Sequence, residues 1–374
     1  MNDRQRGLDL ALPTDEPLAP PSGLRPVHLV FPDARTAEYL VAGLPLAARL
    51  IHAIATGAQG APISVGVATG PWFPSRRCVS ECRRLAGSSP LRIGADGAPD
   101  SDALVVDALD ALAALTRKAR ETMGNRAPRP GMPAANPDQA LREADRLFLL
   151  ATAKPQDGLF SRTFNRPVSR SITRLVFRFA WIEPLHATAG TALIALCMLI
   201  AMLGSPAHGA LIGALLFQAA SVFDGVDGEI ARATFRTSPA GARLDSLIDA
   251  ATNLAFVAGL SANLWLRGDT IAAIAGLAGL ALLLAGLAQI GRRAQMLGEP
   301  INFEAVKVHL RRKPTRRWLV DILIWLTMRD FIAFAAALLA VLGKAIWVPY
   351  IFLSVAVCWF FAITVILARS AGRR

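Results

Sequence analysis

Residues 211–260 read LIGALLFQAASVFDGVDGEIARATFRTSPAGARLDSLIDAATNLAFVAGL, and they decide what kind of fold the chain can adopt. Two apolar runs, each close to the roughly 20 residues that a membrane helix needs, flank a short charged link. Four carboxylates, Asp224, Asp227, Asp245 and Asp249, lie where the link meets the runs. Charged side chains at membrane depth are costly and usually functional, so the stretch predicts two membrane helices with an acidic functional site at their ends.

Apolar runs of similar length continue on both sides of this stretch. Of the 374 residues, 53% are hydrophobic and 18% are charged, whereas soluble domains carry about 25% charged residues. This composition disfavours a purely soluble enzyme and predicts a mainly α-helical, polytopic six-helix membrane domain. The expected spans are residues 186–204, 207–223, 244–266, 270–291, 331–347 and 348–368. Residues 318–330 fit either an interfacial helix or the start of the fifth span.

Basic charge gathers in the apolar part of the chain. Residues 1–150 hold 17 Lys and Arg against 16 Asp and Glu, and residues 151–374 hold 23 against 12. The basic residues cluster in the loop 292–317 and at the C-terminus. The positive-inside rule therefore places both termini on the cytoplasmic side of the cell (inner) membrane. We expect no nucleic-acid partner, which would favour basic charge on a polar surface, and no signal peptide, because no apolar core follows Met1.

A basic helix is expected just before the first span. Arginines recur every four residues, at positions 162, 166, 170, 174 and 178. A four-residue step drifts by only about 40° per turn of a helix, so the arginines form one broad face. We expect this amphipathic helix to lie in the headgroup layer of membrane lipids. A solvated helix face is the alternative.

The N-terminal third is expected to form a separate, small α/β domain. Extended apolar runs at Val27–Phe31 and Ile63–Ala68 enclose a helix-like stretch at Thr36–Thr56, which predicts a βαβ unit with a parallel sheet. A further strand and helix are expected within Ala103–Arg120. The predicted organisation is a flexible N-terminus (1–24), the α/β domain (25–123), a linker (124–153) and the membrane domain (154–374). The four cysteines are too scattered for a disulfide framework or a zinc site.

The four carboxylates are spaced so that they can meet. Asp224 and Asp227 are three residues apart and Asp245 and Asp249 are four apart, so each pair projects from one side of its helix. If the two helices pack side by side, the carboxylates converge and repel one another unless cations bind. Hard oxygen ligands of this kind suit Mg²⁺ or Mn²⁺. The alternative is a set of unrelated helix-end acids paired with nearby arginines.

The full pattern resembles the signature of the CDP-alcohol phosphotransferase (CDP-alcohol phosphatidyltransferase) family, D-x-x-D-G-x-x-A-R, eight residues, G-x-x-x-D-x-x-x-D. Every fixed position between Asp224 and Asp249 matches. The resemblance covers about residues 154–370. It implies a membrane enzyme, as a homodimer, that transfers a phospho-alcohol group from a CDP-alcohol donor to a small hydroxyl acceptor and releases CMP. One departure is Leu185, where many members have Asn in a P-N-x-x-T motif that begins the first span.

The resemblance also implies roles for the signature residues. Two divalent ions, Mg²⁺ or Mn²⁺, would be bound by Asp224, Asp227 and Asp245, with Asp249 as the general base and a further ligand. The CDP moiety would be bound by Gly228, Ala231, Arg232 and Gly241. Separately, four arginines flank the predicted cytosolic mouth, and their planar forks suit a phosphorylated acceptor. They are Arg292, Arg293, Arg311 and Arg329. A plain positive-inside loop is the alternative for them.

The segment from Lys154 to Pro167 is similar to one branch of this family, in which a nucleotidyltransferase-like domain precedes the membrane enzyme, as in the bifunctional inositol-phosphate cytidylyltransferase / di-inositol-phosphate-phosphate synthases. Residues 43–49, GLPLAAR, resemble the G-K-P-L-x-x-R segment of sugar nucleotidyltransferases, but Leu44 replaces the Lys. The expected phosphate loop, residues 31–38, contains no glycine, so its backbone N–H groups could not cradle a triphosphate in the usual way. We therefore expect a degenerate, non-catalytic domain.

Three readings of the function are distinguished. The first is a transferase that uses CDP-diacylglycerol in phospholipid biosynthesis, and its variant uses a soluble CDP-polyol such as CDP-inositol with a lipid or polyol-phosphate acceptor. The second is an ion-coupled transporter whose acids bind the coupling ions. The third is a scaffold without activity. The spacing of Asp, Gly, Ala and Arg across two helix ends argues against the transporter, and the four intact carboxylates argue against the scaffold.

Overall fold

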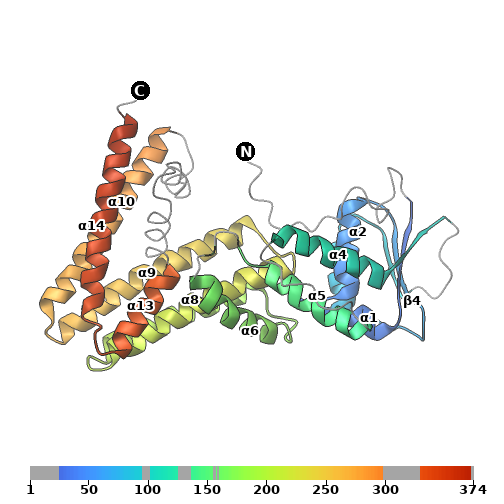
Figure 1. Ribbon diagram of the computed structural model, residues 1–374, viewed down its shortest axis with the longest axis horizontal. Coiled ribbons are helices and arrows are strands. Elements are labelled where there is room, and N and C mark those ends of the chain that lie inside the picture. The colour runs from blue at the N-terminus through green and yellow to red at the C-terminus, as the bar shows by residue number, and fades with distance from the viewer. Residues whose placement is uncertain are drawn as a thin grey trace. The chain divides into compact units, whose positions relative to one another are not determined.

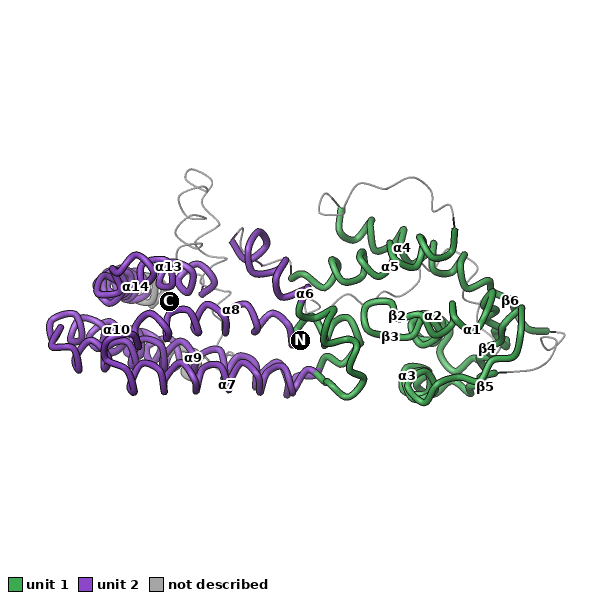
Figure 2. Tube along the Cα trace, turned by 90° about the horizontal axis from the view of Figure 1, so that it is seen from below, with its two compact units in different colours: residues 1–154, 172–183, 228–237 green, residues 155–171, 184–227, 238–374 purple. Residues whose placement is uncertain are grey.

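The computed structural model of the chain describes residues 25–94, 102–124, 136–154, 157, 160–297 and 329–371, with the side chains at 293–297 and 366–371 left out. The chain divides into two compact units, coloured separately in Figure 2. The α/β unit comprises residues up to 154 together with 172–183 and 228–237. The membrane unit comprises residues 155–171, 184–227 and 238–374. The described chain is mostly helical, and its four-stranded sheet lies in the α/β unit, which confirms the predicted fold class.

The α/β unit is built on a four-stranded parallel sheet (Figure 1). Its order is β5-β4-β1-β6, with β5 at Leu91–Ile93, β4 at Ile63–Val67, β1 at Val27–Phe31 and β6 at Leu104–Asp107. In β1, Val27 pairs with a residue of β4 on one side and a residue of β6 on the other. Strands of parallel sheets are covered on both faces, and alternate residues of β1 are fully buried. The predicted βαβ unit and the predicted strand–helix pair, β6 and α4 (Ala108–Met123), are both present.

The helix expected over Thr36–Thr56 is interrupted. The chain forms α1 (Ala34–Glu38), a hairpin of β2 (Leu40–Val41) and β3 (Leu44–Pro45), and then α2 (Leu46–Gly57). Ala42 and Gly43 turn the hairpin with φ angles of 45° and 84°, in the left-handed region that a helix excludes. Pro45 then directly precedes α2 and offers no N–H for a continuing helix.

The linker predicted over 124–153 is wrong for its second part. Helix α5 (Pro137–Ala151) begins with Asn136 as N-cap, whose side chain accepts a hydrogen bond from the N–H of Gln139. Its buried residues recur at helical spacing, and the helix packs against α4. The Pro-rich composition before residue 137 concealed this amphipathic pattern. The third helix that follows a strand, α3 (Arg76–Ala86), packs against α2.

Five helices in the described part of the chain are long and apolar enough to cross a membrane, which indicates a multi-pass membrane protein. They are α7 (Pro184–Gly204), α8 (Gly209–Ala233), α9 (Pro239–Leu266), α10 (Thr270–Leu297) and α14 (Trp347–Ala371). They coincide with the first four and the last of the six predicted spans. Helices α10 and α14 lie side by side (Figure 1).

The fifth predicted span, 331–347, differs from the structure. In the described chain α13 comprises Arg329–Val341, so the helix ends six residues before the predicted end of this span. The chain turns at Gly343, with φ of 70°, and α14 begins at Trp347. Of the ambiguous segment 318–330, the first eleven residues lie outside the described chain, and the last two begin α13.

The membrane unit is held together by apolar stacking and by one buried amide. Phe217 of α8 stacks on Phe256 of α9, with ring centroids 4.0 Å apart. Asn263 of α9 is fully buried and donates hydrogen bonds to the carbonyl oxygens of Met202 (2.7 Å) and Ser205 (3.1 Å) at the C-terminal end of α7. Carbonyls in the last turn of a helix lack partners within that helix, so Asn263 caps α7 from a neighbouring span.

The predicted basic face is only partly present. A π-helical turn, η2 (Ser161–Asn165), leads into α6 (Arg166–Val176). Three of the five arginines, at positions 162, 174 and 178, are exposed as expected. Arg166 is instead buried, and its guanidinium donates two hydrogen bonds, of 2.9 and 3.0 Å, to the carboxylate of Asp157. The exposed basic face is therefore narrower than the sequence indicates.

Candidate functional site

The four signature carboxylates come from two helices of the membrane unit. Asp224 and Asp227 lie on α8, which continues without a break through the glycines of the motif, and Asp245 and Asp249 lie on α9. Asp227 is buried, whereas the other three side chains are partly exposed. The predicted arrangement of two acid pairs on two helices is thus present.

Arg329 brings one carboxylate of each helix together. Its Nη1 atom lies 3.2 Å from Oδ1 of Asp224 and also contacts Oδ1 of Asp249. The Arg329 side chain is only 12% exposed, so one largely buried guanidinium contacts two partly exposed carboxylates. The sequence placed Arg329 at the mouth of the site for an acceptor. The structure places it between two of the acids.

Asp227 has a different partner. The hydroxyl of Thr188, in the first turns of α7, donates a hydrogen bond of 2.7 Å to Oδ2 of Asp227, and both residues are buried. The sequence alone indicates no partner for Thr188, although it is the last position of the motif that begins with Pro184. The exposed Leu185, where the motif departs from its usual Asn, does not disturb this contact.

The start of α13 and the end of η2 are tied to α8 just before the acids. Ser221 of α8 donates a 2.8 Å hydrogen bond to Asp330, the neighbour of Arg329, and accepts one from Asn165 at 3.3 Å. Arg166 approaches so closely that a Cβ atom at Gly225 would lie 2.9 Å from its Nη1. Glycine at 225 therefore allows a buried arginine to reach the backbone between Asp224 and Asp227.

The remaining predicted site residues have the following positions. Asp245 is half-buried on α9, and Gly241 is exposed in the first turn of that helix, where its N–H donates to Oγ of the N-cap Ser238. In the α/β unit, a Cβ at Gly228 would lie 2.8 Å from Nη1 of Arg232, and Nε of Arg232 donates 2.6 Å to the carbonyl of Thr152. Ala231 lies between them on α8, half-buried.

The other acceptor arginines are less informative. Arg292 is exposed near the C-terminal end of α10. The side chain of Arg293 and the whole of Arg311 lie outside the described residues. Of the two arginines in this set whose side chains the structure describes, Arg329 lies beside the carboxylates and Arg292 is exposed.

The donor set suits a hard divalent cation by type, since it consists of carboxylates. Asp224 and Asp249 already share one positive group, the guanidinium of Arg329, which shows that this pair of acids accommodates a cation. Among the residues that the structure describes, no three or more His, Cys, Asp or Glu side chains are gathered as a metal centre.

An apolar cavity adjoins Arg329 within the membrane unit. Its volume is about 270 Å³, and its walls come from α8, α9, α10, α13 and α14. Phe217, Phe331, Phe352 and Trp359 are among the lining side chains. A space of this kind, with a charged group at its edge, suits a ligand that has an apolar body and a polar head.

Comparison with known proteins finds a family match in the C-terminal half of the chain. Residues 184–346 match the CDP-alcohol phosphatidyltransferase family. The chain is 39% identical over 109 residues to the "Bifunctional IPC transferase and DIPP synthase" of Aquifex aeolicus, a match that covers 29% of this chain and 24% of that protein. The proteins of the same name from Thermococcus kodakarensis and Archaeoglobus fulgidus are 32% and 33% identical over 33% and 36% of this chain.

The matched segments span only about a quarter of the length of these relatives, 24%, 27% and 26% respectively. The family match, in contrast, contains the complete signature with its four carboxylates, Thr188 and Arg329. The C-terminal half of this chain therefore carries a domain of the CDP-alcohol phosphatidyltransferase family.

Proposed function

We propose that the chain is a membrane transferase that moves a phospho-alcohol group from a CDP-alcohol to a small hydroxyl acceptor and releases CMP. The observation that carries the proposal is the convergence of Asp224 and Asp249, from two helices of the matched domain, on one cationic group. Carboxylates that meet around a positive charge are what a phosphoryl-type transfer requires, because its catalysis depends on positioning and electrostatics.

In this proposal three of the carboxylates bind metal ions and the fourth is the general base. Asp224, Asp227 and Asp245 would hold two Mg²⁺ or Mn²⁺ ions, which would supply positive charge to neutralise the diphosphate and the departing CMP. Asp249 takes the proton from the acceptor hydroxyl as the hydroxyl oxygen attacks the β-phosphorus. The bond from that phosphorus to the CMP oxygen breaks, and the new bond joins the phospho-alcohol to the acceptor. Gly228, Ala231, Arg232 and Gly241 bind the CDP moiety.

Arg329 would change partners during the cycle. As long as it lies between Asp224 and Asp249, it supplies the positive charge that the two acids need. Cations bound to the carboxylates would release the guanidinium, whose planar fork then suits a phosphate of the acceptor. Arg292, Arg293 and Arg311 are proposed to assist it.

Two donors fit the proposal. CDP-diacylglycerol, with a small acceptor in phospholipid biosynthesis, is supported by the apolar cavity next to Arg329. A soluble CDP-polyol such as CDP-inositol, with a lipid or polyol-phosphate acceptor, is supported by the three relatives named IPC transferase and DIPP synthase. The cavity favours a lipid as one of the two substrates in either case.

The excess of basic residues after residue 150 supports insertion in the cell membrane with both termini in the cytoplasm. A homodimer belongs to the same proposal and can be checked by the mass of the purified protein in detergent. The ion-coupled transporter is the rival reading, and it predicts cation-dependent flux without release of CMP.

The test is release of CMP by membranes that contain the chain, supplied with CDP-diacylglycerol or CDP-inositol and a panel of polyol and polyol-phosphate acceptors. We expect release that requires Mg²⁺ or Mn²⁺, stops on chelation and is restored by the metal. Membranes with Asp224→Ala serve as the matched blank. Cation-dependent flux in proteoliposomes with no release of CMP from either donor would instead support the transporter.

A further inference from the structure

The turn that joins α8 to α9 lies between the two parts of the signature and has a strained backbone. Phe235 has a φ of 55°, in the left-handed region, which is a genuine outlier for a bulky side chain. Such a conformation persists only when surrounding contacts over-determine it. The turn, residues 233–237, belongs to the α/β unit, and the contacts described below that hold it come from the same unit.

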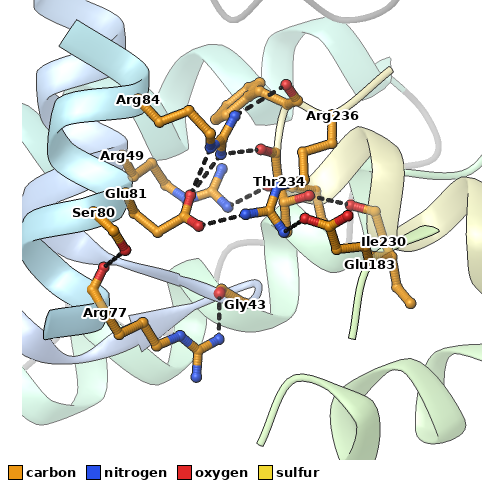
Figure 3. A network of polar contacts seen from close by, with 12 residues as sticks. Gly43, Arg49, Arg77, Ser80, Glu81, Arg84, Glu183, Ile230, Thr234 and Arg236 are labelled. Atoms are coloured by element: carbon orange, nitrogen blue, oxygen red, sulfur yellow. Dashed lines mark hydrogen bonds and ion pairs between the residues drawn. The ribbon is translucent and has the colours of Figure 1, made fainter. Parts of the chain in front are cut away.

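Two arginines of the N-terminal domain cap the end of α8. Nη2 of Arg49, on α2, donates 2.8 Å to the carbonyl of Ala233, and Nη2 of Arg84, on α3, donates 2.7 Å to the carbonyl of Thr234 (Figure 3). The last carbonyls of a helix lack partners within the helix, and positive side chains there also interact favourably with the negative end of the helix dipole. The N-terminal domain thus supplies what the end of α8 lacks.

Arg49 reaches the carbonyl of Ala233 from a buried position in the N-terminal domain. It is 3% exposed, and it also donates to the carbonyls of Val41 and Ala42 in the β2–β3 hairpin. Its guanidinium lies 5.0 Å from the ring centroid of Phe148 and 5.3 Å from that of Phe235. Burial lowers the pKa of Arg49 to about 10, so the side chain remains charged at neutral pH. This is the Arg of the segment that resembles a nucleotidyltransferase motif.

Further contacts fix the side chains of the turn itself. The ring of His52 on α2 packs at a tilt against that of Phe235, with centroids 4.0 Å apart. Glu81 on α3 accepts from Arg84 and from Arg236, each at 2.6 Å, and Arg236 also pairs with Glu183 (Figure 3). The turn is therefore held through its backbone, its aromatic ring and its charge.

The same unit holds a signature residue directly. Nε of Arg232 donates to the carbonyl of Thr152, just beyond α5, and the Arg232 guanidinium covers Gly228. Both residues are proposed to bind the CDP moiety. Fixing the end of α8 at Ala233 and Thr234 therefore also fixes Arg232, the residue directly before Ala233, and Gly228, which lies about one and a half turns earlier on the same helix.

We infer that the N-terminal α/β domain is a positioning module for donor recognition: through Arg49, Arg84 and Glu81 it holds the turn 233–237 and thereby sets the place of Gly228 and Arg232. This inference rests on the proposed transferase function. The N-terminal domain lacks a glycine-rich phosphate loop. In this inference its helices α2 and α3 position residues of the signature and do not bind a separate nucleotide.

The experiment uses the full chain in membranes. Arg84→Ala removes the cap on Thr234 at a position where the side chain is 31% exposed, so folding is spared, and Arg84→Lys restores a charged donor. Loss of a charged hydrogen bond predicts a rise of about tenfold or more in KM for the CDP-alcohol donor, with a smaller change in kcat. Hydrogen exchange of residues 231–240 should be faster in Arg84→Ala and near the wild-type rate in Arg84→Lys.

Glu143→Ala is the matched control. It removes the ion pair between Arg120 and Glu143, which joins α4 to α5 in the same unit without touching the turn. An unchanged donor KM in Arg84→Ala, or an equal loss in Glu143→Ala, would overturn the inference. If the wild-type chain releases no CMP, the proposed function fails. The exchange measurement separates the two outcomes, because faster exchange at 231–240 in Arg84→Ala alone would still establish that the domain holds the turn.

Discussion

The contact between Thr188 and Asp227 offers the sharpest test of the site. Thr188→Val keeps the β-branched shape of the side chain and removes the hydroxyl that donates 2.7 Å to the buried carboxylate. A hydrogen bond to a charged group is worth about 1.5–3 kcal/mol, and about 1.4 kcal/mol corresponds to a factor of ten in rate. We therefore expect kcat/KM for CMP release to fall by about 10- to 150-fold.

Two further variants make the measurement specific. Thr188→Ser retains a hydroxyl and should recover most of the activity. Thr191→Val removes a hydroxyl one turn later on the same helix, at a site that is also buried, but that hydroxyl bonds to the carbonyl of Ala187 in its own helix. We expect Thr191→Val to retain activity near the wild-type level. All variants are compared at equal amounts of protein in the membrane.

The reasoning is refuted if Thr188→Val turns over CDP-alcohol with the wild-type kcat/KM. An equal loss in Thr191→Val would also contradict it, because the cause would then be a general disturbance of α7. Magnesium titrations add a second readout. If Asp227 is held in place for metal binding, Thr188→Val should need more Mg²⁺ for half-maximal activity than Thr191→Val needs.

Three other predictions concern the carboxylates and the N-terminal domain. Asp224→Ala, Asp227→Ala and Asp245→Ala should each abolish CMP-linked transfer while the protein remains in the membrane, and wild-type activity in any of them would remove that residue from the metal site. Asp249→Asn should lose turnover by about 10²–10⁴-fold yet still bind CDP-diacylglycerol, whereas Asp224→Asn should lose both, so a loss of binding in Asp249→Asn would make it chiefly a ligand. The purified chain, given CTP and a panel of sugar or polyol phosphates, should release no pyrophosphate, and robust release would show that the domain is catalytic despite Leu44.

The parts of the fold that the sequence predicts correctly depend on short-range patterns. Span lengths follow from runs of apolar residues, and the two acid pairs follow from spacings of three and four residues on helices. The break in the helix expected over Thr36–Thr56 was not visible, because Ala42 adopts a positive φ that its residue type does not signal. The amphipathic α5 was hidden by the Pro-rich residues before it.

The contacts that organise the site could not be predicted in the same way. Arg49 and Ala233 are 184 positions apart, and no local pattern relates a helix in an α/β domain to the end of a membrane helix. The sequence indicates an acceptor-binding role for Arg329 from its planar guanidinium and its place near the predicted mouth, and nothing in its neighbourhood indicates that it reaches Asp224 and Asp249. The motif that begins with Pro184 marks Thr188 as a candidate site residue. It does not indicate that the partner of Thr188 is Asp227 on another helix.

Asn263 has a consequence for how the protein is made. The carbonyl of Met202 lies in the last turn of the first membrane helix, and the Asn263 amide that donates to it belongs to the third. The carbonyl of Ser205 also accepts from the N–H of Gly209, so Met202 is the group that depends on Asn263. Backbone groups without partners are costly near lipid, so the end of α7 stays incompletely bonded until α9 is inserted beside it. An Asn263→Leu chain should consequently accumulate in the membrane to a lower level than the wild type, which immunoblotting of membrane fractions would measure.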